Sequence, residues 1–394
     1  MSAGKSKEIS SGFTASNKAK LVRGGQDYFR QLLLLIEQAR ETIHLQTYIY
    51  ASDETGKTIG NALIAAAKRN VQVYLIADGY ASREMSPAFI RQLEEAGVHF
   101  RFFEPLFKSG YYYFGRRLHH KLFVADNQYA LVGGVNISNN YNDLPGKPAW
   151  LDFALFAEGE IARELCVLCW KTWNGYPKRN ATPPCGKMQA DTGISPEEAC
   201  FIRMRRNDWV RGKNQVSKSY IQVFRQATAE IIIVSSYFLP GRHFRKKISE
   251  AARRGVRVRV LLAGTSDVSI AKQAERYMYR WLLKDNIEIY EYLPTVLHGK
   301  IAICDDKWFT IGSYNVNNIS AFASIELNLD VSNEKLAGSV KQTIESIIEK
   351  DCIRITEKKL NTGHHLLRRL WQEICYTAIR VLYYLFTFYF KRKR

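Results

Sequence analysis

The sequence lacks a long uninterrupted apolar run. Its first twenty residues, "MSAGKSKEISSGFTASNKAK", are polar and contain no apolar segment of the kind that a secretory signal carries. The longest apolar run near the C-terminus, residues 381–390, has only ten residues, which is short of a membrane span. We therefore expect the N-terminus to stay where it is made, and residues 1–20 to form a disordered tail.

Cysteine is also scarce, and the seven that are present do not suggest a disulfide framework. Cys166 and Cys169 lie three residues apart in "ELCVLCW", which has the pattern of a helix. Cys185 and Cys200 follow without forming the second close pair that a zinc site would use. We therefore expect packed helix thiols, no metal, and a reducing compartment.

Acidic residues are few compared with basic ones. The chain has 38 Asp and Glu against 57 Lys and Arg, which gives a formal net charge of +19. Such a surplus indicates a polyanionic partner, either nucleic acid or an anionic membrane, and does not choose between the two.

Two long segments of the chain resemble one another. Residues 39–79 and 227–265 each contain a β-rich run, a loop, an amphipathic helix and a second apolar strand. The likeness continues through residues 96–105 and 285–294, each a strand stopped by proline, into two final segments with the pattern of β-hairpins. A repeat of this length predicts two similar domains, because the repeats of solenoid proteins are far shorter.

Alternating strands and helices predict an α/β fold with a mixed, largely parallel sheet in each half. We expect a first domain over residues 21–180, a linker over 181–200 where Pro, Gly and polar residues cluster, and a second domain over 201–355. The first half carries about ten extra residues, "LFKSGYYYFGRRL", just before its polar motif.

Each half carries the same polar motif, His-x-Lys-x4-Asp-x6-Gly-(Gly/Ser)-x-Asn. It comprises His119, Lys121, Asp126, Gly133, Gly134 and Asn136 in the first half, and His298, Lys300, Asp305, Gly312, Ser313 and Asn315 in the second. Two copies at equivalent places of a repeat are hard to obtain by chance. On a strand, residues i and i+2 face the same side, so each histidine points the same way as its lysine. His120, like Gly299, belongs to the opposite face.

This set of side chains suits exchange at a phosphodiester. The substrate is anionic and resists attack, so the site needs positive charge and hydrogen-bond donors. Lys121, Lys300, Asn136 and Asn315 supply both. One histidine can attack phosphorus and form a phosphohistidine, while the other protonates the leaving oxygen and later deprotonates the incoming hydroxyl. The ordinary pKa of histidine, near neutrality, suits both tasks.

Four carboxylates accompany the motifs. Asp152 in "WLDFALF" and Glu326 in "SIELNLD" lie in apolar, strand-like contexts, where an unpaired carboxylate is costly. We expect each to orient a histidine through its second ring nitrogen. Asp126 and Asp305 belong to the catalytic motif, but each also suits the turn of a hairpin. For these two we expect a supporting, structural role.

The double motif resembles that of the phospholipase D superfamily, and its surroundings resemble bacterial cardiolipin synthases. The similarity rests on "HHKLFVAD…LVGGVNIS", "WLDFALFAEG", "SYFLPGRHFRKKISEAARRGVRVRVLL" and "HGKIAICDDKWFTIGSYN", and it extends over about residues 21–332. Gly134 stands where the wider superfamily often has serine, although Gly-Gly is usual in cardiolipin synthases.

The resemblance implies a fold and a reaction. Members use no metal or other cofactor and share one active site at the interface of two similar α/β/α sandwich domains related by pseudo-twofold symmetry. His119 would be the nucleophile and His298 the general acid and base. Cardiolipin synthases transfer a phosphatidyl group to the headgroup hydroxyl of phosphatidylglycerol, and they release glycerol when phosphatidylglycerol is also the donor.

Two aromatic and basic segments suit contact with lipid. The C-terminal residues 361–394 are amphipathic and predict a helix held at a membrane interface, the alternative being a terminal helix packed on its domain. The extra segment of the first half suits a lipid contact or a capping loop, and it contains Tyr111, Tyr112, Tyr113 and Phe114 between Lys108, Arg116 and Arg117. We expect a protein on the cytoplasmic face of the cell membrane, peripheral or interfacially anchored.

Other functions would use the same residues. Phospholipase D hydrolysis and phosphatidylserine synthesis need the same site, and a nuclease of this superfamily would also use a basic surface with aromatic side chains. The aromatic, basic C-terminus argues against nucleic acid as the partner. A non-enzymatic membrane-binding scaffold would not need two intact motifs. We therefore expect cardiolipin synthase-type transfer, with phosphatidylglycerol and a membrane surface as partners.

Overall fold

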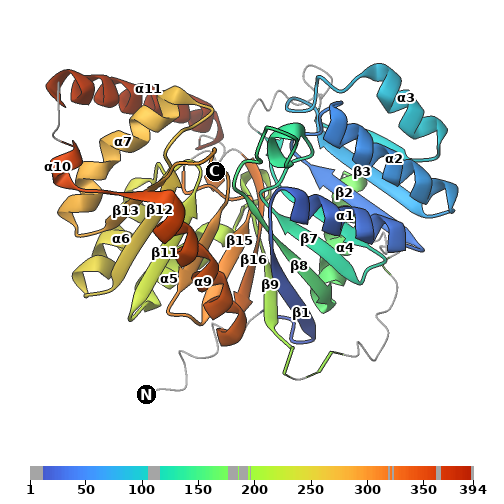
Figure 1. Cartoon of the computed structure of the whole chain (residues 1–394), viewed down its shortest axis with the longest axis horizontal. Coiled ribbons are helices and arrows are strands. Elements are labelled where there is room, and N and C mark those ends of the chain that lie inside the picture. The colour runs from blue at the N-terminus through green and yellow to red at the C-terminus, as the bar shows by residue number, and fades with distance from the viewer. Residues whose placement is uncertain are drawn as a thin grey trace.

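The computed structural model describes residues 12–104, 116–175, 185, 194–195, 197–317, 320–321, 324–360 and 365–391. Figure 1 shows two α/β halves side by side, with β7 and β8 of the first half near β15 and β16 of the second. The helices α1, α2 and α3 lie on the outside of one half, and α5, α6 and α7 lie on the outside of the other.

The first half is built on a seven-stranded sheet in the order β1-β8-β7-β6-β2-β3-β4. Its elements are β1 (Asn17–Arg23), α1 (Gln26–Gln38), β2 (Thr42–Thr47), α2 (Glu54–Lys68), β3 (Gln72–Asp78), α3 (Pro87–Glu95), β4 (His99–Phe103), β5 (Arg117–Leu118), β6 (Lys121–Ala125), β7 (Tyr129–Gly133), the 3-10 turn η1 (Asn139–Tyr141), β8 (Phe153–Gly159) and α4 (Glu160–Trp173).

The second half repeats this order, because β16-β15-β14-β11-β12-β13 corresponds to β8-β7-β6-β2-β3-β4. Its elements are β9 (Phe201–Asp208), η2 (Trp209–Arg211), β10 (Lys213–Asn214), α5 (Gln215–Gln226), β11 (Glu230–Ser235), α6 (Arg242–Arg253), β12 (Arg257–Ala263), α7 (Ser269–Lys284), β13 (Glu288–Tyr292), β14 (Ile301–Cys304), β15 (Trp308–Gly312), β16 (Ser324–Ser332), α9 (Glu334–Asp351), β17 (Cys352–Ile355), α10 (Glu357–Leu360) and α11 (His365–Lys391). The predicted pair of similar α/β domains is confirmed.

The expectation of largely parallel sheets is wrong. Along the two sheet orders, only β2-β3-β4 and β11-β12-β13 run parallel among the described residues, and the other neighbouring strands are antiparallel. Off these paths, the short β5 pairs with β16 in parallel. The βαβ units do form, but each half then returns through a meander of adjacent strands, β6-β7-β8 or β14-β15-β16. Short polar turns allow only antiparallel neighbours.

Within the described residues, three large hydrophobic cores hold the molecule together, alongside two smaller clusters. One lies between the first sheet and α1, α2 and α3, and another lies between the second sheet and α5, α6 and α7. The third is shared, because Val132 and Phe153 of the first half and Ile311 and Leu327 of the second belong to one buried cluster with side chains of α4 and α9. The halves are therefore joined by a continuous core, which fixes the position of one motif relative to the other.

Two expectations about the ends and the cysteines need correction. Residues 1–11 of the predicted tail lie outside the described residues, but from residue 12 the chain is ordered, since Thr14 pairs with Ile202 and β1 begins at Asn17. Cys166 is bonded to Cys185 in a disulfide rather than being a free thiol. Their Cα atoms lie 6.2 Å apart, a contact of the linker with α4 that sequence spacing does not reveal. The rest of the predicted linker is described only at residues 194–195 and 197–200.

The C-terminal α11 packs across α7 on the outside of the second half (Figure 1). Over the part of the chain that the structure describes, no helix has both the length and the apolar character needed to cross a bilayer.

Candidate active site

The first histidine is placed by a strand that crosses between the halves. β5, just before His119, pairs in parallel with β16 of the second half, with Leu118 opposite Ile325. The backbone N–H of His119 then donates to the carbonyl of Ile325 over 3.1 Å. This register brings the next residue of β16, Glu326, beside the imidazole, and its Oε2 lies 3.0 Å from Nδ1 of His119.

The second histidine is placed in the same way with the halves exchanged. Leu297, just before His298, forms a parallel bridge with Leu151, two residues before the first half's β8. The backbone N–H of His298 donates to the carbonyl of Leu151 over 2.7 Å, and Nδ1 lies 2.6 Å from Oδ2 of Asp152. Each histidine is thus bonded to a carboxylate of the other half.

Both motif lysines are buried beside their histidines. Lys121 Nζ donates to the carbonyl of His119 over 2.5 Å and lies 5.1 Å from the ring centre of Tyr48. Lys300 Nζ donates to Ser236 Oγ over 3.0 Å and lies 3.0 Å from Nδ1 of His298. Burial lowers the pKa of Lys121 to about 7, helped by repulsion from Lys300, and burial lowers the pKa of Lys300 to about 8. The effect of Lys300 on the pKa of Lys121 is consistent with the two ammonium groups lying in one region.

Burial also sets the protonation of the histidines. It lowers the pKa of His119, against the opposing effect of the Glu326 carboxylate. It lowers the pKa of His298 well below the ordinary value, and the charges of Lys300 and Lys121 act in the same direction. Burial raises the pKa of Asp152 to about 7. Both imidazoles are therefore neutral near pH 7, the form in which a ring nitrogen can act as nucleophile or base.

Both motif asparagines are buried. Asn136 Oδ1 accepts the backbone N–H of Ile49 over 3.0 Å, which fixes the direction of its amide group. Asn315 is only 4% exposed, and within the described residues its Oδ1 has no hydrogen-bond partner. Its backbone N–H donates to Ser320 Oγ over 3.2 Å.

The two motifs differ at one position, Gly134 or Ser313, and each of these residues contacts the carboxylate of its own half. A Cβ atom on Gly134 would lie 2.3 Å from Oδ1 of Asp152, so a side chain there must displace the carboxylate. The hydroxyl of Ser313, at the equivalent place, donates to Oε2 of Glu326. The departure at Gly134 therefore has a local reason: the shorter Asp152 occupies the space that a side chain would need.

Three aromatic side chains complete the site, and sequence reasoning did not assign them to it. The Tyr48 ring stands edge-on to His119 with ring centres 4.9 Å apart. Tyr141, in η1, has its ring centre 5.1 Å from that of His298 and its hydroxyl 3.4 Å from Nε2, and Trp150 lies on the same side. Tyr48 ends a recognisable strand, but nothing in the loop around Tyr141 identifies that residue.

The motif aspartates lie at the far ends of their strands from the histidines. Asp126 accepts the backbone N–H groups of Arg40, Glu41 and Thr42, and Asp305 accepts those of Thr228, Ala229 and Glu230. Asp126 and Asp305 also open the two predicted hairpin turns, with φ of 51° and 49°. Each aspartate therefore ties its hairpin to the start of β2 or β11, and neither reaches the reacting region.

The residues between each histidine and lysine point away from the site. His120 is fully buried, its Nε2 lies 2.8 Å from Oε1 of Gln46, and burial lowers its pKa to about 3. A Cβ atom on Gly299 would lie 2.8 Å from the ring of Phe153, so the shared core requires a small residue there.

The extra segment of the first half is described only at its end. Tyr111, Tyr112, Tyr113, Phe114 and Lys108 lie outside the described residues. Arg116 pairs with Glu104 at 2.6 Å and with Asp208 of the second half at 3.1 Å. Arg117 lies 3.6 Å from Asp78. Both arginines are held by carboxylates of the protein, and whether the segment contacts lipid or caps the site stays a prediction.

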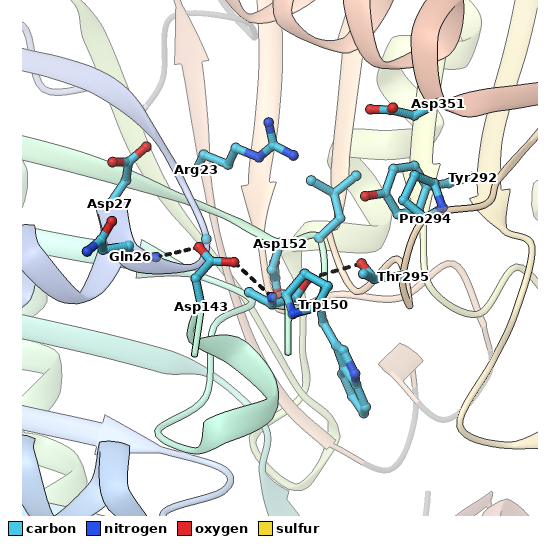
Figure 2. A pocket seen from close by; sticks show the side chains of 14 residues that line it. Arg23, Gln26, Asp27, Asp143, Trp150, Asp152, Tyr292, Pro294, Thr295 and Asp351 are labelled. Carbon is cyan, nitrogen blue, oxygen red and sulfur yellow. Dashed lines mark hydrogen bonds between the residues drawn. The ribbon is translucent and has the colours of Figure 1, made fainter. Parts of the chain in front are cut away.

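A cavity of about 480 Å³ borders the site at the junction of the halves. Figure 2 shows Asp152 and Trp150 of the first half opposite Tyr292 and Thr295 of the second. Thr295 Oγ1 donates to the carbonyl of Ala149 over 3.0 Å, which holds the two loops together. Because Asp152 also binds His298, the cavity shares a wall with the second histidine.

Comparison with known proteins agrees with this architecture. The family model described as "Cardiolipin synthase, PLD-like domain" matches residues 32–145 and 220–348. The crystal structure of phosphatidylserine synthase from Haemophilus influenzae Rd KW20 superposes with a TM-score of 0.75 over 97% of this chain and 98% of that chain, at 14% identity, which is a likeness of fold. The double motif on this fold defines a member of the phospholipase D superfamily.

Similar proteins of known name point to one family within this superfamily. Cardiolipin synthase B of Escherichia coli (strain K12) is 32% identical over 349 residues, covering 87% of this chain and 83% of the relative. Cardiolipin synthase 1 of Bacillus anthracis is 30% identical, covering 87% of this chain and 68% of that protein. The chain belongs to the cardiolipin synthase family of phospholipase D-like proteins, and the resemblance drawn from its motifs is confirmed.

Proposed function

We propose that this protein is a cardiolipin synthase-type phosphatidyltransferase that works through a phosphohistidine. It joins two molecules of phosphatidylglycerol and releases glycerol. The observation that carries the proposal is the pair of buried histidines, each bonded through Nδ1 to a carboxylate of the opposite half and accompanied by a lysine.

The first step forms the covalent intermediate. Nε2 of His119 attacks phosphorus, and the bond from phosphorus to the oxygen of the headgroup glycerol breaks. His298 gives that oxygen a proton, and the phosphatidyl group stays on His119. This requires His298 to be protonated when substrate is bound, and the negative phosphodiester favours that form by offsetting the nearby ammonium groups. His119 suits attack because Glu326 holds Nδ1, and no hydrogen bond to Nε2 is present within the described residues.

The second step releases the product. His298, now neutral, takes the proton from a headgroup hydroxyl of a second phosphatidylglycerol, the hydroxyl oxygen attacks phosphorus, and the bond to His119 breaks. The charges balance, because one proton enters with the acceptor and one leaves with glycerol. Tyr141, whose hydroxyl lies 3.4 Å from Nε2 of His298, is placed to guide this exchange.

The lysines and asparagines stabilise the phosphate during both steps. An anion between Lys121 and Lys300 raises the pKa of both, which burial otherwise lowers to about 7 and about 8. Charged lysines and the amide groups of Asn136 and Asn315 then offset the charge that develops on the non-bridging oxygens. Because both substrates are membrane lipids, the enzyme works at the cytoplasmic face of the cell membrane as a peripheral protein.

A direct assay tests the activity. Purified full-length protein is incubated with phosphatidylglycerol vesicles, and the lipid and water-soluble products are measured. We expect equal amounts of cardiolipin and glycerol, and neither from the matched His119→Ala protein. If the products were phosphatidic acid and glycerol, with no cardiolipin, the reaction would be hydrolysis and not transfer. Cleavage of nucleic acid without any lipid product would overturn the proposal.

A further inference from the structure

One face of α11 is already used inside the protein. Cys375 is 2% exposed and belongs to a small core with Ala274 and Met278 of α7, and Tyr376 and Ile379 pack against the same core. The rings of Tyr376 and Tyr277 stack with centres 4.8 Å apart. This inner face fixes α11 on the second half.

A different face of the same helix is apolar and exposed. It carries Leu366, Leu367, Leu370, Trp371, Ile374, Val381 and Leu382, whose exposed fractions lie between 49% and 71%. At 3.6 residues per turn, all of these except Leu366 share a single stripe with Ala378, on the side away from Ile379 and Tyr376. We call this set the outer stripe. Together with Leu366, it accounts for half of the large hydrophobic side chains that are exposed within the described residues.

Positive charge accompanies the outer stripe. Arg368, Arg369 and Arg380 lie on the described part of α11 together with a single acid, Glu373. No salt bridge of these arginines is present among the described residues, and Arg380 lies 5.5 Å from the ring centre of Tyr376. The arginines beside this apolar face would repel those of a second copy of the same helix. A surface of anionic headgroups instead attracts them.

We propose that the outer stripe of α11 docks into the interfacial region of an anionic phospholipid bilayer, with the helix lying in the membrane plane. The proposal rests on the proposed function, whose substrate is an anionic membrane lipid. A bilayer interface takes up leucine, isoleucine and tryptophan side chains from one helix face while its headgroups meet the arginines. Docking requires no unfolding, since a separate face of α11 holds it on α7.

The position of α11 relates the membrane plane to the active site. Leu239 belongs to the same small core as Cys375 and forms a bridge with Asn317, two residues beyond the site residue Asn315. Glu275 of α7 accepts the backbone N–H of Phe238 over 2.9 Å. Both contacts hold the loop that follows Ser236, the partner of Lys300. A docked outer stripe therefore fixes the orientation of the active-site loop against the bilayer.

The test compares charged and apolar variants of the outer stripe in the full-length protein. The double variant Leu370→Glu/Ile374→Glu places two charges on the outer stripe, and Leu370→Phe/Ile374→Phe keeps the stripe apolar. Thr377→Glu adds a single charge at the edge of the stripe, beside Leu370. Flotation uses vesicles of phosphatidylcholine with and without phosphatidylglycerol. We expect the double Glu variant to bind anionic vesicles about 100-fold more weakly, the double Phe variant to bind like the parent, and Thr377→Glu to lose much less.

Activity measured on two substrates separates this proposal from the proposed function. With short-chain phosphatidylglycerol below its micelle concentration, the double Glu variant should match the parent, whereas with vesicles its rate should fall together with its binding. Quenching by brominated lipid should disappear in Trp371→Phe, because that ring enters the bilayer. A parent that floats but makes no cardiolipin from either substrate would refute the proposed function alone.

Two results would overturn the membrane assignment. Equal flotation of the parent and the double Glu variant would show that the outer stripe does not bind lipid. A change from dimer to monomer in sedimentation, with flotation unchanged, would assign the stripe to a second copy of the chain.

Discussion

The two histidines occupy equivalent places in the two halves but have different surroundings. The side chain of His119 is 16% exposed and shares Oε2 of Glu326 with the hydroxyl of Ser313. The side chain of His298 is 9% exposed and lies among Asp152, the Lys300 ammonium group and the Tyr141 hydroxyl. A duplicated backbone supplies two imidazoles, and we propose that the neighbouring side chains suit one to attack phosphorus and the other to carry a proton.

The largest effect should come from replacing each histidine in turn by alanine and assaying both variants with an activated donor, which separates the roles of the two residues. Phosphatidyl p-nitrophenol needs no proton on its leaving group, so His298→Ala should still release one equivalent of p-nitrophenolate in a burst and then stall. His119→Ala should give no burst and lose turnover by about 10⁴-fold or more. Stopped-flow absorbance measures both, and a burst from His119→Ala would reverse the assignment.

His120→Ala is the matched control for that experiment. The side chain adjoins His119 but bonds to Gln46 on the opposite face of the strand. We expect the folded variant to keep most of its activity, with any loss arising from the buried hydrogen bond. A loss as large as that of His119→Ala would contradict the alternation of the strand.

Glu326→Gln should have the next largest effect. Without the carboxylate, Nδ1 of His119 loses its orienting partner, and we expect kcat to fall on the order of 10²–10³-fold. Burial lowers the pKa of His119 and Glu326 opposes it, so removing the charge should lower that pKa further. The acid limb of the pH profile of kcat/KM should therefore move to lower pH. A shift to higher pH would contradict the pairing.

Gly134→Ser tests the difference between the two motifs with a smaller effect. The new Cβ would lie 2.3 Å from Oδ1 of Asp152, so the carboxylate must move away from its place beside His298. We expect about 1–3 kcal/mol of lost stability and about a tenfold loss of activity. Ser313→Gly removes a Cβ and a hydroxyl that bonds to Glu326 and Leu327 but displaces no carboxylate, and it should cost less. Equal effects would mean that the two carboxylates are interchangeable.

Asp305→Asn should have almost no effect on kcat and should change only stability. Burial works to raise the pKa of Asp305, but hydrogen bonds from the backbone N–H groups of Glu230, Thr228 and Ala229 outweigh it, and the pKa is lowered. Its stabilisation is therefore full above the ordinary aspartate pKa and is lost as pH falls. Asp305→Asn should lose about 1–3 kcal/mol at neutral pH and less in acid, measured by urea unfolding. Asp126→Asn is the companion variant in the first half.

Sequence predicted the elements of this site better than their connections. The alternation of His119, His120 and Lys121 along a strand follows from local geometry, and a repeat makes the second motif interpretable. The partner of each histidine depends on the bridges Leu118–Ile325 and Leu151–Leu297, which join residues far apart in the chain and leave no local pattern. For the same reason Tyr141 and Ser236 were missed as neighbours of His298 and Lys300.

For the fold, too, local elements could be predicted and long-range connections could not. The βαβ units and the hairpins could be predicted from periodicity and turn residues, but the direction of most neighbouring strands could not, because it depends on where the chain returns to the sheet. From composition, the extra segment with its arginines suited either a lipid contact or a capping loop, and the ion-pair partners of the arginines could not be predicted. Arg116 joins Glu104 to Asp208 across the junction of the halves, a pairing that only the folded chain brings together.

The exchange of carboxylates between the halves has an evolutionary consequence. After a duplication, one copy is ordinarily free to drift while the other keeps the activity. Here we expect a change at Glu326 or Ser313 to affect the histidine of the other copy, and a change at Asp152 or Gly134 to do the same in reverse. Selection would then act on two groups of residues that each span both copies, so at these positions the halves could diverge only through matched substitutions.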